Sequence, residues 1–226
     1  MGEELYDEDH GEATDSTSSN EKESHHLKKL ENDLDGKWKE ALAQIDYGFD
    51  LGTSTIFVFG EIGDGSLYDL ILRIRAILHM RGEDRKDESI NLVINSDGGD
   101  VYEALGMIDY IQSLSVRVNT ICRGRAMSAA ALLLCSGTGI RAASKNSTVM
   151  FHEISSGIYG KSSDMKANMV HMEKLEDILL ELITSNTKKE RRFWKDKTVK
   201  DYYLTPDEAL DLGVIDTIIP TTFTRE

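Results

Sequence analysis

Along the chain, short apolar runs typical of strands alternate with segments whose apolar residues recur at helical spacing. This pattern predicts alternating strands and helices. Residues 66–80 predict an amphipathic helix, because their apolar side chains recur at helical spacing. These side chains are Leu67, Leu70, Ile71, Ile74 and Ile77. Residues 55–62 and 88–94 predict strands, and the second ends in an apolar run typical of a strand covered on both faces. This alternation predicts a mainly parallel α/β sheet built from βαβ units.

The alternation continues through the second half of the chain. It predicts helices at residues 100–114 and 128–136, and strands at residues 116–122, 139–143, 147–152 and 214–219. A long helix is predicted from about Asp164, and a stripe of methionine and leucine along it indicates a packing face, in the core or between subunits. The stripe consists of Met165, Met169, Met172, Leu175, Leu179 and Leu182. Thr205 and Glu208 form a capping-box pattern, which predicts a short helix that ends at Gly213.

The acidic residues are concentrated at the N-terminus. Residues 1–36 hold 12 Asp and Glu residues against 3 lysines, in a chain of 226 residues with a net charge of −14. This segment is too polar to bury the apolar area that would offset its ordering entropy, so we expect a disordered acidic tail. The remaining residues carry 28 acids and 23 bases. This balance argues against a nucleic-acid-binding surface, which requires a basic stripe.

Cysteine use and hydropathy indicate the compartment. The two cysteines, Cys122 and Cys135, lie within apolar runs, which is typical of buried thiols in a reduced cytoplasmic protein rather than of a disulfide scaffold. The chain shows no N-terminal apolar signal segment, and no apolar run approaches the roughly 18 residues needed to span a bilayer. We therefore expect a cytoplasmic protein with no membrane partner.

One hydroxyl residue stands directly before the apolar part of the predicted helix at 128–136. The stretch GRAMSAAALLL places Ser128 between a glycine-bearing turn and a run of small and aliphatic residues. On this stretch alone helix capping is the simpler interpretation, because a serine at a helix start satisfies an orphan backbone N–H. The alternative is a nucleophile, whose oxygen would lie in the positive field of the helix N-terminus.

Other groups suited to acyl transfer stand elsewhere in the chain. Gly98 and Gly99 end the segment INSDGG, and a glycine pair there fits an oxyanion hole or an anion nest equally well. His152 ends a predicted strand, and Asp201 lies beside two tyrosines. Acyl transfer by a serine requires a base, an acid that orients the base, and N–H donors. The His and acidic residues show no metal-ligand spacing, so we expect neither a metal nor another cofactor.

These segments together are similar to a known family. Residues 55–220 resemble the proteolytic subunit of the Clp protease, a self-compartmentalising serine peptidase. The resemblance is carried, in the family's order and nearly its spacing, by INSDGGDVYEALGMIDYIQ, TICRGRAMSAAALLLCSG, NSTVMFHE and DYYLTPDEALDLGVID. It implies that Ser128 is the nucleophile, His152 the general base and Asp201 the residue that orients the base.

The resemblance also implies the surroundings of these side chains. The backbone N–H groups of Gly99 and Ala129 would form the oxyanion hole. The fold would be the crotonase-like α/β fold of Clp proteases, with a protruding helix-strand handle at about residues 153–187. Family members stack heptameric rings into a tetradecamer, and a partner AAA+ unfoldase uses ATP to thread unfolded proteins into the chamber. The expected activity is therefore cleavage of unfolded proteins by a serine endopeptidase.

The expected organisation divides the chain into four parts. These are an acidic tail at residues 1–36, a lead-in at 37–54, the peptidase domain at 55–220 and a C-terminal tail at 221–226. Asp97 stands where the family usually has proline, and Glu153 and Ile154 replace the Gln-Pro that usually follows the histidine. The family's N-terminal axial loop is not recognisable, which leaves docking to a standard unfoldase open. This is similar to shortened phage-encoded members, which would act in the host cytoplasm.

Three alternative functions stay open at this point. A phage maturation protease would use the same chemistry to trim capsid components. A crotonase-fold acyl-CoA hydratase or isomerase shares the oxyanion geometry but normally works without a Ser-His-Asp set. An inactive structural ring subunit would keep the fold alone. The presence of Ser128, His152 and Asp201 favours the peptidase over the last two.

Overall fold

The computed structural model describes residues 28–29, 36, 48–155 and 161–220. By its internal contacts the chain divides into two units, Met1–Ala43 and Gln44–Glu226. In the first unit, the three residues described are helical and exposed. The rest of the predicted acidic tail, most of the lead-in and the predicted C-terminal tail lie outside the described residues. The second unit holds the sheet and every candidate site residue.

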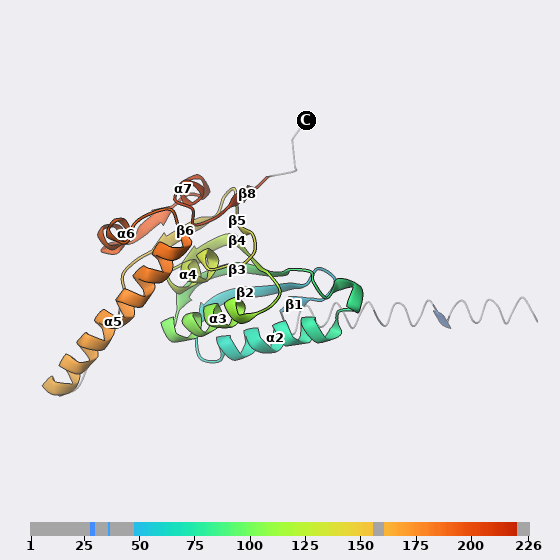
Figure 1. Ribbon diagram of the computed structural model, residues 1–226, viewed down its shortest axis with the longest axis horizontal. Helices are drawn as coiled ribbons and strands as arrows, with labels where there is room; N and C mark the ends of the chain where they lie inside the picture. Colours follow the sequence, from blue (N-terminus) through green and yellow to red (C-terminus); the bar gives the residue numbers. More distant parts are fainter. Residues whose placement is uncertain (1–27, 30–35, 37–47, 156–160, 221–226) are drawn as a thin grey trace, which may run out of the picture. The chain divides into compact units, whose positions relative to one another are not determined.

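A mainly parallel sheet organises the second unit (Figure 1). Its strands are β1 (Phe49–Asp50), β2 (Thr55–Ile62), β3 (Ile90–Gly99), β4 (Val118–Met127), β5 (Arg141–Ser144), β6 (Thr148–Phe151), β7 (Tyr202–Leu204) and β8 (Thr217–Ile219). They run in the order β1-β2-β3-β4-β5-β8, and β6 pairs with β4 and β7. Only the pairs β1–β2 and β6–β7 among these described strands are antiparallel. The predicted parallel α/β class is therefore confirmed.

Helices cover the sheet and extend one end of the unit. They are α2 (Ser66–Met80), the 3₁₀ helix η1 (Glu83–Arg85), α3 (Val101–Ser113), α4 (Ala129–Cys135), α5 (Ser162–Asn186), α6 (Arg191–Thr198) and α7 (Pro206–Asp211). α2 packs on α3 and β2, and α4 packs on α3, β3 and β4. Figure 1 shows the N-terminal end of α5 projecting away from the sheet. No helix in the described part of the chain is long and apolar enough to cross a membrane.

Strand β4 divides its pairing between two neighbours. Its first half pairs with β5 through Thr120–Cys122, and its second half pairs with β6 through Arg125–Met127. On the other side β4 pairs with β3, with a register shift between Ile94 and Ser96. The carboxyl ends of β3, β4 and β6 therefore meet at one edge, because these strands are parallel.

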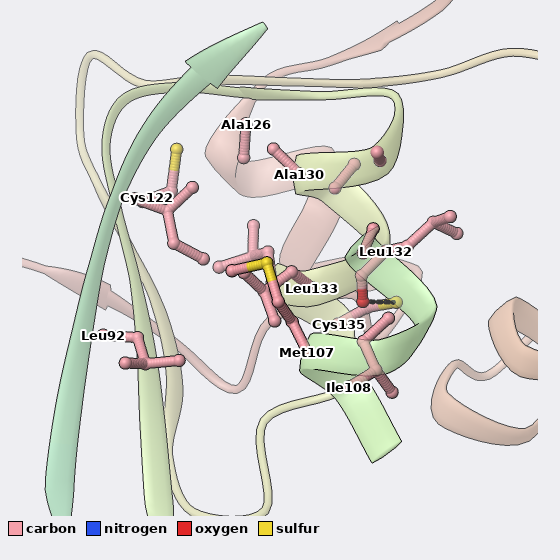
Figure 2. Close-up of a cluster of buried hydrophobic side chains, with 14 of the residues drawn as sticks. Leu92, Met107, Ile108, Cys122, Ala126, Ala130, Leu132, Leu133 and Cys135 are labelled. Carbon is pink, nitrogen blue, oxygen red and sulfur yellow. Dashed lines mark hydrogen bonds between the residues drawn. The ribbon is translucent and has the colours of Figure 1, made fainter. Parts of the chain in front are cut away.

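Helix α4 is buried along its whole length, and its sequence explains why. All seven of its residues, AAALLLC, are small or aliphatic and are 4% exposed or less. Figure 2 shows Leu132, Leu133 and Cys135 of α4 among Leu92 and Cys122 of the strands and Met107 and Ile108 of α3. Burying each large aliphatic side chain stabilises the fold by about 1.5–3 kcal/mol. This packing fixes the start of α4, and so Ser128, against the sheet.

Most predicted elements agree with the structure, and the differences have local causes. β2 and α2 have the predicted bounds, and the capping box of Thr205 and Glu208 is present. β3 and β4 run beyond their predicted ends, because Gly98 and Gly99 of β3 still pair with β2 and Arg125–Met127 of β4 pair with β6. β1, η1, α6 and β7 were not predicted. α6, with the sequence RRFWKDKT, buries only Trp194 and Thr198, which is too short an apolar pattern to signal a helix.

The stripe predicted along the long helix divides into two parts. Leu175 and Leu179 are 3% and 8% exposed and pack in the core, whereas Met165 and Met169 are 40% and 58% exposed. The C-terminal half of α5 therefore anchors the helix, and the N-terminal half carries apolar side chains outside the core. Residues 156–160, which belong to the predicted handle at about 153–187, lie outside the described residues.

Arg141 on β5 connects the residue before β8 with the ends of α4 and α5. The Arg141 guanidinium donates to both carboxylate oxygens of Asp216, at 3.1 and 2.5 Å. It also donates to the backbone carbonyls of Cys135, at the end of α4, and Asn186, at the end of α5. These hydrogen bonds from Arg141 hold the pKa of the Asp216 carboxyl below its usual range.

We expect Asp216→Asn to lower the free energy of unfolding by about 1 kcal/mol at pH 7, below the usual range for charged hydrogen bonds because the Asp216 side chain is 42% exposed. Since the folded-state pKa is lowered, this contribution is present above the unfolded value of about 3.9 and is lost as the pH falls through the folded value. Urea denaturation of both proteins at pH 7 and pH 3 measures it. A difference that stays constant between the two pH values would contradict this assignment.

Candidate active site

Ser128 lies at the junction of β4 and α4 in a backbone conformation that is rare for a residue with a side chain. Its φ is 54° and its ψ is −124°, a combination that costs energy and is found mainly at functional sites. The Ser128 N–H donates to the carbonyl of Met150 on β6 at 2.8 Å, which holds the turn in place. The Ser128 side chain occupies the N-cap position but makes no capping hydrogen bond. The capping interpretation of this serine is therefore wrong, and its hydroxyl is available for chemistry.

The glycine pair at the end of β3 lies against this turn. A Cβ on Gly98 would come within 2.5 Å of the Met127 carbonyl and 2.9 Å of the Ser128 Cβ, so only glycine fits there. Gly98 and Gly99 both have positive φ, at 95° and 142°, which glycine adopts at little cost. Gly98 N–H is bonded to the Ser96 hydroxyl at 3.0 Å. Gly99 lines the same cavity as Ser128.

His152 follows directly after β6 and is held by its own neighbour. Its Nδ1 lies 2.5 Å from the Glu153 carbonyl oxygen. A carbonyl only accepts hydrogen bonds, so Nδ1 carries the proton and the neutral ring keeps its lone pair on Nε2. The next N–H, that of Glu153, donates to the carbonyl of Thr198 on α6 at 2.8 Å. The ring is therefore in the tautomer that a general base requires.

Asp201 directly precedes β7, as His152 directly follows β6, but the two side chains make no hydrogen bond with each other. Phe151 pairs with Tyr202 in the antiparallel β6–β7 ladder, so extending that ladder by one pair would place His152 opposite Asp201. Asp201 is exposed and accepts a hydrogen bond from the Tyr203 hydroxyl at 3.3 Å. Among the described residues, no hydrogen bond joins His152 to Asp201 or to Ser128.

Four of the five predicted site residues share one cavity. It has a volume of about 250 Å³, and Gly99, Ser128, Ala129 and His152 all line it, whereas Asp201 does not. Its remaining wall is largely apolar and comes from the start of α3, from α4, from β6 and the residues after it, and from α5. The apolar lining consists of Val101, Leu132, Phe151, Ile154, Met172, Leu175, Leu179, Leu180 and Ile183. The structure thus brings together a hydroxyl, an imidazole and the start of a helix in a partly enclosed space.

Asp97, which stands where the family usually has proline, forms an ion pair with a residue of the neighbouring strand. Its carboxylate lies 2.6 Å from Nε of Arg125 on β4. Both side chains are at least half exposed, so the pair contributes little to stability. Its effect is local, because it joins the strand end that carries Gly98 to the one that leads to Ser128.

Sequence reasoning missed two further polar contacts around the cavity. The Tyr102 hydroxyl lies 2.6 Å from His171 Nε2, and the two rings stack with an interplanar angle of 6°. The Glu176 carboxylate accepts the Ile154 N–H at 3.1 Å. The sequence holds no local signal for either contact, because the partners lie 69 and 22 residues apart.

The cysteines do not compete with Ser128 as nucleophiles. Burial raises the pKa of the Cys122 thiol to about 11 and that of Cys135 to about 12, so both stay protonated at neutral pH, and the thiolate is the reactive form. Both thiols are free, as predicted. No group of His, Cys, Asp and Glu in the described ranges is suited to hold a metal ion.

A serine hydroxyl, an imidazole and the start of a buried helix in one cavity of a mainly parallel α/β sheet are typical of the serine hydrolases. A family model described as Clp protease matches residues 39–222. The ATP-dependent Clp protease proteolytic subunit 1 of Prochlorococcus marinus strain MIT 9312 is 33% identical over 147 residues, which cover 65% of this chain and 75% of the relative. Subunit 2 of Parasynechococcus marenigrum strain WH8102 is 34% identical over 160 residues, 70% of this chain and 81% of that protein. The chain belongs to the Clp protease family and is a serine endopeptidase of its proteolytic-subunit type.

We expect Gly98→Ala to abolish peptide hydrolysis, because the added methyl group would displace the Ser128 turn and force a positive φ on alanine. Gly63→Ala is the matched control, since a Cβ there would meet nothing within 4 Å and its φ is not positive. Turnover of a fluorogenic peptide by both variants measures the effect. Equal activity of the two variants would show that the glycine contact does not shape the site.

Proposed function

We propose that Ser128, His152 and Asp201 carry out the peptide hydrolysis, as nucleophile, general base and orienting acid. The observation that carries this proposal is the positive φ of Ser128 at the start of a buried helix, with its hydroxyl free of any cap. His152 supports it, because the ring lines the same cavity in the tautomer that leaves Nε2 unprotonated. The backbone N–H groups of Gly99 and Ala129 are the proposed oxyanion donors, and both residues line that cavity.

The proposed reaction runs in two halves. The Ser128 Oγ attacks the substrate carbonyl carbon while His152 Nε2 takes its proton, and the carbonyl oxygen becomes an oxyanion that accepts from the Gly99 and Ala129 N–H groups. The carbon–nitrogen bond then breaks, the leaving amine takes the proton from His152, and an ester of Ser128 remains. Water, deprotonated by His152, attacks this ester, releases the acid product and restores the Ser128 hydroxyl.

The proposed role of Asp201 requires the His152 Nδ1 proton to change its hydrogen-bond acceptor. In the structure the Glu153 carbonyl accepts the Nδ1 proton of His152. In the proposed reactive arrangement the Asp201 carboxylate accepts it instead and stabilises the imidazolium that forms during attack. The register of β6 and β7 supports this role, because Phe151 and Tyr202 are paired and His152 and Asp201 are the next residues outward.

We also propose the assembly. Clp proteases work as rings with ATPase partners, and we propose stacked heptameric rings, a tetradecamer, that enclose the active sites. The exposed methionines of α5, Met165 and Met169, support this, because apolar side chains on a projecting helix need a second subunit to cover them. The proposed substrates are unfolded proteins that an AAA+ unfoldase delivers in the cytoplasm, at the cost of the unfoldase's ATP.

We expect a fluorophosphonate serine probe to label the purified wild-type protein and to leave Ser128→Ala unlabelled, with both proteins of the same native mass. The reason is that the probe reacts only with a serine that a neighbouring base activates. Mass spectrometry of the labelled peptide identifies the residue. Labelling that persists in Ser128→Ala would overturn the assignment of the nucleophile, and a native mass near 25.3 kDa would overturn the ring.

We expect Ser128→Gly to be as inactive as Ser128→Ala. Its free energy of unfolding should be about 1 kcal/mol greater than that of Ser128→Ala. Glycine adopts a φ of 54° without the strain that a Cβ causes. Denaturant unfolding of the two variants measures the difference. An alanine variant as stable as the glycine variant would show that the turn stores no strain.

A further inference from the structure

One charged side chain interrupts the apolar wall that α5 contributes to the site cavity. Six residues of α5 line this cavity, at the spacing of one helix face. They are Met172, Leu175, Glu176, Leu179, Leu180 and Ile183. Five of the six are apolar, and Glu176 is the exception. A carboxylate in an apolar wall loses part of its hydration, which is unfavourable unless another group binds it.

The chain itself supplies this carboxylate with a single partner. Oε2 of Glu176 accepts the Ile154 N–H at 3.1 Å, and in the part of the chain that the structure describes no other hydrogen bond or ion pair reaches Glu176. An ionised carboxylate offers about four lone-pair sites to donors. Glu176 is only half-buried, so lone pairs of its carboxylate stay open to a donor that enters the cavity.

The charged residues around the cavity are acidic on balance. Besides Glu176, the charged or titratable residues that line it are Asp100, His152 and Glu153, and no described lysine or arginine does so. The Asp100 carboxylate accepts two backbone N–H groups at the start of α3, and the helix N-terminus offsets its charge. Glu153 is exposed, so water and salt screen its charge. The charge of Glu176 therefore acts most strongly within the cavity.

A second hollow adjoins the site cavity at Glu176 and is also acidic. It has a volume of about 530 Å³, and both cavities are lined by Glu176, Ile154 and Met172. The charged residues that line it are Glu153, Glu173, Glu176, Asp177 and Lys195. Four acids against one base leave this surface negative, which attracts a cationic group towards the site cavity.

The position of the site cavity determines which part of a peptide enters it. Ser128 and the proposed oxyanion residues Gly99 and Ala129 line it. The substrate residue whose carbonyl is attacked carries its side chain on the adjacent Cα, so this is the side chain that enters. Lysine and arginine bury their aliphatic stems along apolar surface while the charged end reaches a polar partner. In serine peptidases, a carboxylate in the pocket beside the nucleophile selects basic side chains at this substrate position.

We propose that Glu176 is a specificity-determining residue that makes this peptidase cleave after lysine and arginine. The stem of the basic side chain lies against the apolar wall, and its cation binds the Glu176 carboxylate. This inference rests on the proposed role of Ser128 as the nucleophile, because that role makes the cavity the binding place of the residue before the cleaved bond. It does not depend on which group accepts the Nδ1 proton of His152, since α5 places Glu176.

The test compares two fluorogenic peptides that differ only in the residue before the cleaved bond, which is lysine or norleucine. Norleucine has an unbranched aliphatic stem like that of lysine but lacks the ammonium group. For the wild type we expect kcat/KM to be about tenfold or more higher for the lysine peptide. Glu176→Gln keeps the size of the side chain and removes its charge, so we expect the lysine-to-norleucine ratio of kcat/KM to fall by about 10- to 100-fold, as for one charged hydrogen bond.

Glu173→Gln is the matched control. Glu173 lies one turn earlier on α5 and lines the second hollow but not the site cavity, so the variant removes the same charge from the same helix. We expect its lysine-to-norleucine ratio to stay within about twofold of the wild-type ratio. A wild type without a preference for lysine would overturn the inference, as would equal ratios for Glu176→Gln and Glu173→Gln. Native mass and thermal unfolding of each variant show whether the fold and assembly are kept.

A second measurement separates this inference from the proposed function. Peptidyl diphenyl phosphonates that carry the same lysine or norleucine label an activated serine without turnover, and mass spectrometry identifies the labelled residue. If neither phosphonate labels Ser128, or if Ser128→Ala keeps hydrolysing the peptides, the proposed function fails and the inference with it. If both phosphonates label Ser128 at the same rate, the proposed function stands and only the role of Glu176 is overturned. Faster labelling by the lysine phosphonate, lost in Glu176→Gln, supports both.

Discussion

The site depends on the close approach of β3 to the turn between β4 and α4. At Gly98 the two backbones are so near that a single methyl group would lie 2.5 Å from the Met127 carbonyl. This approach brings Gly99 and Ser128 to one cavity, and it is possible because parallel strands end at the same edge of a sheet. The buried helix α4, which begins directly after the turn, anchors the turn in the core. The strained φ of Ser128 is stable because packing and the Met150 hydrogen bond determine it from both sides.

The His152 imidazole is brought to the same cavity by a different strand, β6. β4 changes partners along its length, so that β6 lies beside the half that leads to Ser128. β6 in turn is supported by the C-terminal part of the chain, through β7 and through Trp194 of α6. The nucleophile and the proposed base therefore follow directly after two adjacent parallel strands, while the elements that support β6, which are β7 and α6, come from further along the chain.

The sequence predicted those parts of the structure that local patterns encode. The spacing of Leu70, Ile74 and Ile77 fixes α2, and the capping box at Thr205 fixes α7, because both signals lie within one or two helical turns. The alternation of strands and helices gives the α/β class. The contact of Glu176 with Ile154 could not be predicted, since it depends on the rotation of α5 and on a backbone N–H that exists only because position 154 is not proline. Likewise, the segment motifs indicate Asp201 but not that the Glu153 carbonyl holds His152.

Helix α5 belongs both to the proposed contact between subunits and to the wall of the site cavity. Its 25 residues form one continuous helix, whose exposed half carries Met165 and Met169 and whose buried half carries Glu176 among leucines of the core. An α-helix is stiff over this length, so a displacement of the exposed half moves the carboxylate that binds the Ile154 N–H. The proposed ring contact and one wall of the site cavity thus belong to the same helix. A second subunit that covers Met165 and Met169 would therefore bear on the helix whose buried half lines the cavity of Ser128 and His152.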